Sequence, residues 1–149
     1  MPEATIAVIG ALATLAVNGT AGAFAGLRWW QVRTSPAVWP LLRAGQVVAG
    51  CQALLAGVLY AAGYRPGDGL YWLYALLPVA IGLIAEQLRI ASAEQVLENR
   101  DLPDVQAVGA LPESEQRSVV LAVVRREIGG MALAALVVTL LALRAALIA

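Results

Sequence analysis

The sequence predicts an all-α integral membrane protein: a four-transmembrane-helix antiparallel bundle with a cytoplasmic helical hairpin between spans 3 and 4. Three observations lead to this prediction. The 149 residues are 60% hydrophobic and 13% charged, with a mean hydropathy of +0.76, whereas soluble chains carry about 25% charged residues. Four apolar stretches are each long enough to cross a bilayer, which takes about 20 helical residues. Eight of the ten arginines fall on one side of these spans.

Apolar residues dominate four stretches, and these are the predicted spans: about 5–27, 41–62, 69–88 and 128–148. The chain start carries Glu3 in place of a positive n-region, which predicts a retained span and not a cleaved signal peptide. After the first span, "RWWQVRTSPAVWP" combines arginines, prolines and tryptophans. After the second, "GYRPGDG" is a short polar turn. The whole chain is therefore expected to form a single membrane domain.

The third connection, about 86–127, predicts a helical hairpin. "EQLRIASAEQVLENR" extends the third helix in helix-forming residues, and "RDLPDVQAVGALP" breaks it with two prolines and a glycine. Pro112 followed by Glu113 and Glu115 is typical of a helix start. Residues 118–124 then either continue into the fourth span or lie flat at the membrane surface as an amphipathic segment. The sequence leaves these two alternatives open.

The arginine distribution predicts the orientation. The first and third connections carry Arg28, Arg33, Arg43, Arg89, Arg100, Arg117, Arg125 and Arg126, and the opposite side carries Arg65 and Arg144. The positive-inside rule then places both connections in the cytoplasm and both termini outside. All basic residues are arginines, and Ala and Leu dominate, which is typical of a GC-rich bacterial genome. We therefore expect a multi-pass protein of the bacterial cytoplasmic (inner) membrane.

Small residues form two candidate helix-packing seams, because small side chains let membrane helices approach closely. The first span repeats a small or polar residue every four positions, and the second has two glycines seven positions apart. The packing candidates are Gly10, Thr14, Gly22, Gly26, Gly50 and Gly57.

The candidate intramembrane polar residues are Asn18, Gln46 and Gln52. An amide in the membrane needs a hydrogen-bond partner, and an interhelical bond would supply it. Contact with a ligand is the alternative. Cys51, beside Gln52, is interpreted as a small apolar filler.

Glu86 lies near the cytoplasmic end of the third span, with arginines expected at the same depth. The candidate ion-pair cluster contains Glu86, Arg89, Arg43, Arg125 and Arg126. A carboxylate among arginines at this depth is typical of an ion-pair anchor. A coupling site for protons or cations, which would usually lie deeper and face a cavity, is the alternative.

The sequence lacks the residues on which several classes of function usually depend. The chain has no His, one Cys and zero net charge, so we expect no metal, no cofactor, no catalytic constellation and no nucleic-acid partner. Asp101 and Asp104 leave a weak case for an enzyme acting on lipids. The leading hypothesis is a non-catalytic membrane protein acting through helix packing, as an accessory, assembly or scaffold subunit, with itself or another membrane protein as partner. The alternative is a homo-oligomeric transporter or channel that uses the intramembrane polar residues.

Overall fold

The computed structural model describes residues 2–149, which contain helices and loops but no strand. Four helices are long and apolar enough to cross a membrane: α1 (Pro2–Trp30), α2 (Val38–Ala61), α3 (Leu70–Glu98) and α5 (Glu113–Ile148). The fifth, α4 (Val105–Gly109), is a single short turn between α3 and α5. The predicted all-helical class with four candidate membrane-spanning helices is confirmed, and it indicates a lipid bilayer environment.

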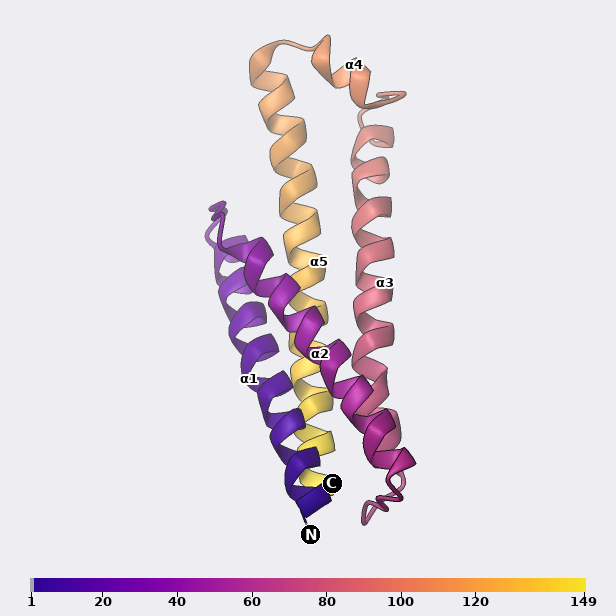
Figure 1. The fold of residues 1–149 in the computed structure, drawn as a ribbon. Helices are drawn as coiled ribbons and strands as arrows, with labels where there is room; N and C mark the ends of the chain where they lie inside the picture. Colours follow the sequence, from indigo (N-terminus) through magenta and orange to yellow (C-terminus); the bar gives the residue numbers. More distant parts are fainter. Residues whose placement is uncertain (1) are drawn as a thin grey trace.

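The helices extend beyond the predicted spans. Helix α3 runs to Glu98, past the predicted boundary at residue 88, and α5 begins at Glu113. The sequence left open whether residues 118–124 lie flat at the membrane surface or continue into the fourth span. In the structure they belong to the continuous helix α5, which leads into that span. At the far end from the chain termini, α4 and its flanking loops join α3 to α5 (Figure 1).

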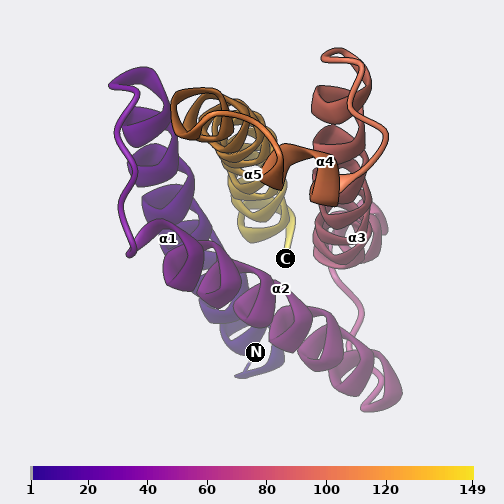
Figure 2. The ribbon, with the colours of Figure 1, turned by 90° about the horizontal axis from the view of Figure 1, so that it is seen from above.

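Helix α5 occupies the centre of the arrangement. Its contacts with α1 and α3 are the most extensive in the molecule, and α2 contacts α1 more than it contacts α3. Seen from above, α1, α5 and α3 stand in a row while α2 crosses one face of that row (Figure 2). Both chain termini lie at one end of the molecule (Figure 1).

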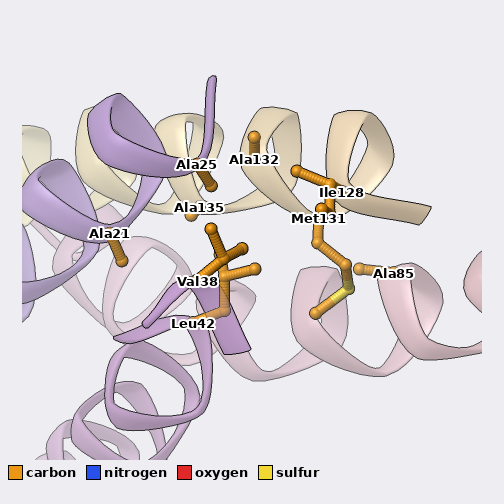
Figure 3. Close-up of a cluster of buried hydrophobic side chains, with 9 residues drawn as sticks. All are labelled: Ala21, Ala25, Val38, Leu42, Ala85, Ile128, Met131, Ala132 and Ala135. Carbon is orange, nitrogen blue, oxygen red and sulfur yellow. The ribbon is translucent and has the colours of Figure 1, made fainter. Parts of the chain in front are cut away.

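Small side chains fill much of the core. One cluster lies where α1, α2, α3 and α5 meet, and it consists of Ala21, Ala25, Val38, Leu42, Ala85, Ile128, Met131, Ala132 and Ala135 (Figure 3). A second cluster, nearer the termini, includes Ala7, Ala11, Ala56, Leu59, Tyr71, Ala75 and Ala145. Because lipid tails are as apolar as these side chains, close van der Waals packing between the helices stabilises such a core.

The end of α1 has an unusual residue. The amide of Arg33 donates to the carbonyl of Arg28 (3.0 Å), and that of Val32 donates to Trp29 (3.2 Å), the pattern of a Schellman motif. The left-handed position of this motif is usually glycine, as at Gly63 (φ 89°) after α2, but here it is Val32 (φ 54°). A β-branched residue is strained in this conformation.

Candidate functional site: a carboxylate cluster between α2, α3 and α5

Glu86 on α3 is the acceptor for three side chains from two helices. Arg43 Nη1 on α2 donates to Oε1 at 2.7 Å, and Arg43 Nη2 donates to Oε2 at 3.3 Å. Gln46 Nε2 donates to Oε1 at 2.9 Å, and Arg89 Nε donates to Oε2 at 3.1 Å. Helical spacing explains the set, because residues three apart share a helix face, as do Arg43 with Gln46 and Glu86 with Arg89.

Glu127 on α5, which the sequence analysis did not include, completes this carboxylate cluster. Its Oε1 lies 4.0 Å from Arg89 Nη1, so Arg89 lies between two carboxylates. The cluster thus joins α2, α3 and α5, and its members are Arg43, Gln46, Glu86, Arg89 and Glu127. The position of Glu127, next to the start of the fourth predicted span, is the signal that could have identified it.

Arg125 and Arg126, the other two candidates for this cluster, contact different groups. The Arg125 guanidinium lies over the Trp29 ring, 5.5 Å from its centroid, and Arg126 Nη2 donates to Gln95 Oε1 at 2.6 Å. Trp29 also packs on α5, since a Cβ placed at Gly129 would lie 2.7 Å from its Nε1.

The hydrogen bonding of the Glu86 carboxylate suits an ion-pair anchor between helices. Each of its carboxylate oxygens accepts two hydrogen bonds from protein groups, which uses about four lone-pair sites on the ionised group. A cation or proton entering this site would have to displace these donors. The cluster borders a groove of about 280 Å³ between α2 and α3, whose walls include Gly50 and Gly82.

Asn18 on α1 has an interhelical partner. Its Nδ2 donates to the carbonyl of Gly45 on α2 at 3.0 Å and to that of Thr14 at 3.1 Å. The approach is close, because a Cβ at Gly45 would lie 2.6 Å from Asn18 Oδ1. Of the two expectations, an interhelical hydrogen bond and a ligand contact, the structure has the interhelical hydrogen bond. Its acceptor residue, Gly45, was not identified from the sequence.

Gln52 is placed differently from Gln46. It is 3% exposed and faces the interior, and within residues 2–149 neither its Nε2 nor its Oε1 meets a hydrogen-bond partner. The buried face of α2 consists of Val38, Leu42, Gly45, Ala49, Gln52, Ala56 and Leu59. The sequence analysis had instead placed Gly50 and Gly57 on a packing seam.

The candidate packing residues fall into two groups. A Cβ at Gly10 would lie 2.8 Å from Leu55 Cδ2, and one at Gly22 would lie 2.9 Å from Leu136 Cγ, so both are close-packed. Thr14 is buried and its hydroxyl donates to the Gly10 carbonyl at 3.1 Å. Around Gly26, Gly50 and Gly57, the described chain places no atom within 4 Å of such a Cβ.

Opposite net charges in the sequence predict that the first and third connections lie together: residues 28–43 carry three arginines and no acid, and residues 86–127 carry five arginines and eight acids. One ion pair, between Arg43 and Glu86, does join the two connections, and Trp29 lies against Arg125. Over residues 2–149, however, no ion pair joins Arg28 or Arg33 to an acid of residues 86–127. Arginines of both connections line one pocket there instead. Trp30, which the same prediction would place in this contact beside Trp29, is 77% exposed.

Comparison of the chain with protein families, with curated proteins and with solved structures finds no match. Within the described residues 2–149, no group of three or more Cys, Asp or Glu side chains is placed to hold a metal ion.

Proposed function

We propose that this protein is a non-catalytic membrane protein that acts through helix packing, as an accessory, assembly or scaffold subunit. We propose further that it pairs with a second copy of itself through the outer face of α2. The carboxylate cluster supports this proposal, since its saturated hydrogen bonding suits a fixed anchor for α2, α3 and α5 and not an exchanging site.

The observation that carries the proposal is that two glycines on α2 have open space where a side chain would lie. Gly50 and Gly57 lie seven residues apart, so they recur on one side of the helix, and the space beyond both is empty. Beside them runs an exposed ridge of Val47, Leu54 and Val58. A ridge next to a groove on one helix is self-complementary, so the ridge of one copy can enter the groove of another about a two-fold axis.

Substitution of both glycines tests this pairing. We expect Gly50→Leu/Gly57→Leu to weaken dimerisation in liposomes about tenfold or more, which corresponds to about 1.4 kcal/mol. The reason is that two leucines fill the groove that the partner's ridge would enter. Energy transfer between donor- and acceptor-labelled copies, measured at increasing dilution in lipid, gives the dissociation constant.

The control is Gly26→Leu on α1, which adds the same side chain at another open glycine. It should leave the dissociation constant unchanged. A monomeric wild-type protein at every lipid dilution, or equal weakening by the control, contradicts pairing through α2.

Gln52 is the one observation that favours the alternative function, a homo-oligomeric transporter or channel, because a buried amide without a partner is costly. The interior cavity that Asn18 and Gln46 line offers it little support, since Gln52 is not among its lining residues. The cavity beside Asn18 and Gln46 holds about 20 Å³, room for about one water molecule. A flux of protons or cations through liposomes containing the protein, abolished by Gln52→Leu, would favour this alternative.

For the orientation, we propose an antiparallel four-span bundle in the bacterial inner membrane, with both termini outside and the α3–α4–α5 hairpin in the cytoplasm. The positive-inside rule supports it, as does the position of both termini at one end (Figure 1). With Cys51 replaced by Ala, we expect a cysteine at position 68 to react with an impermeant maleimide on intact cells and one at position 35 to react only after lysis. The reverse pattern would invert the orientation.

A further inference from the structure

A pocket of about 260 Å³ lies where the turn after α1 meets the start of α5 and the end of α3. Four arginines line it: Arg28, Arg33, Arg100 and Arg125. They come from both connections that the arginine count assigns to one side of the membrane. This arginine pocket is separate from the open face of α2 and goes beyond the function proposed above.

The pocket carries positive charge without a matching carboxylate. No Asp or Glu is among its lining residues, and across residues 2–149 none of its four arginines forms an ion pair. Four guanidinium groups around one cavity repel one another unless an anion lies between them. The fold holds them together even so, through the turn at Val32 and the packing of Trp29 on α5.

The contacts of these arginines leave most of their donors free. Arg28 and Arg125 lie over the rings of Phe24 (5.1 Å) and Trp29 (5.5 Å), contacts that orient a guanidinium without using its N–H groups. Arg100 donates to the Ser118 hydroxyl at 3.1 Å. The Nε of Arg28 is buried, and the described part of the chain supplies no acceptor for it. Each guanidinium has five N–H donors in a planar fork that suits phosphate oxygens.

The other residues that line the pocket indicate which kind of phosphate-bearing molecule fits it. Trp29, Val32, Leu121 and Ile128 form an apolar wall, and Trp and Arg together at a helix end are typical of the membrane–water interface. We propose that the arginine pocket binds the head-group phosphate of an anionic phospholipid, with the apolar wall against the glycerol and the upper part of its chains. A bound lipid would tie the first connection to the α3–α4–α5 hairpin.

Native mass spectrometry of the full-length protein, released from detergent with equal amounts of phosphatidylglycerol and phosphatidylcholine of the same chains, tests this proposal. We expect phosphatidylglycerol to be retained about fivefold or more over phosphatidylcholine. Arg33→Gln and Arg100→Gln should each lower phosphatidylglycerol affinity about fivefold, the effect of one arginine near an anionic head group. Both side chains are exposed, so their replacement should leave the fold intact.

The matched control is Arg117→Gln, which removes one exposed arginine from α5 just before Ser118 but outside the pocket lining. It should retain wild-type lipid selectivity. Equal retention of the two lipids, or an equal loss in the control, overturns the proposal. A third arm adds inorganic pyrophosphate to the lipid-free protein: if it binds at the four arginines while lipid selectivity is absent, the phosphate source is soluble and the lipid proposal is wrong.

Discussion

Gly22→Leu should destabilise the protein more than any other substitution at the first-span glycines. A Cβ at this position would lie 3.1 Å from the backbone nitrogen of Leu136 as well as 2.9 Å from its Cγ. A side chain can rotate away, but the α5 backbone cannot move without separating α1 from α5, the most extensive contact in the molecule. Because overpacking of a core typically costs about 1–3 kcal/mol, we expect a loss of about 3 kcal/mol. Thermal unfolding in detergent, followed by tryptophan fluorescence, measures it.

Gly26→Leu is the control, one helical turn along the same predicted stripe. No described atom lies within 4 Å of its Cβ position, so we expect it to unfold within about 0.5 kcal/mol of the wild type. The sequence alone named both glycines as packing candidates, and the structure separates the two. Equal behaviour of the two variants would mean that α1 is rotated relative to α5 from the orientation described here.

Glu86→Ala should be the second most damaging substitution. It removes the acceptor of Arg43, Gln46 and Arg89 together, and hydrogen bonds to a charged group are worth about 1.5–3 kcal/mol. The side chains are partly exposed, 49% for Arg43 and 23% for Glu86, so water compensates for part of the loss. We expect a decrease of about 2 kcal/mol in the free energy of unfolding, and about half of it for Glu86→Gln, which keeps an acceptor oxygen.

Glu94→Ala provides the matched control, because it removes an exposed acid from the same helix two turns further along. Its stability should equal that of the wild type. A double-mutant cycle with Arg43→Gln then isolates the coupling between Glu86 and Arg43. Loss of a proton- or cation-dependent flux in a stably folded Glu86→Gln protein would contradict the anchor interpretation and favour transport.

The seam of α2 shows why sequence could not predict which face packs. Both Gln46–Gly50–Ala53–Gly57 and Gly45–Ala49–Gln52–Ala56 have alternating spacings of three and four, and each contains small residues and one glutamine. In a membrane, hydrophobicity does not distinguish an inward face from a lipid-facing one, because lipid is as apolar as the core. Only the placement of α2 against α1 selects the second set, in which the Gly45 carbonyl accepts a hydrogen bond from Asn18.

The Glu86 cluster was more predictable. The spacing of Glu86 and Arg89 along one helix required no tertiary information, and Arg43 was expected at the same depth from span lengths alone. Which of the four candidate arginines pair with Glu86 was not predictable, because pairing depends on how each helix is rotated about its own axis. Rotation directs Arg125 to Trp29 and Arg126 to Gln95.

The sequence by itself determined the helical class, the four candidate spans and the breaks between them, because the cost of exposing backbone polar groups and charges to lipid acts locally along the chain. The tertiary structure decided which helices are neighbours: α5 in the centre, α2 across one face, and arginines of two distant connections around one pocket. Those choices depend on van der Waals fit between small residues, such as Gly22 against Leu136. Such contacts join residues far apart in sequence, so no local pattern of hydrophobicity or charge encodes them.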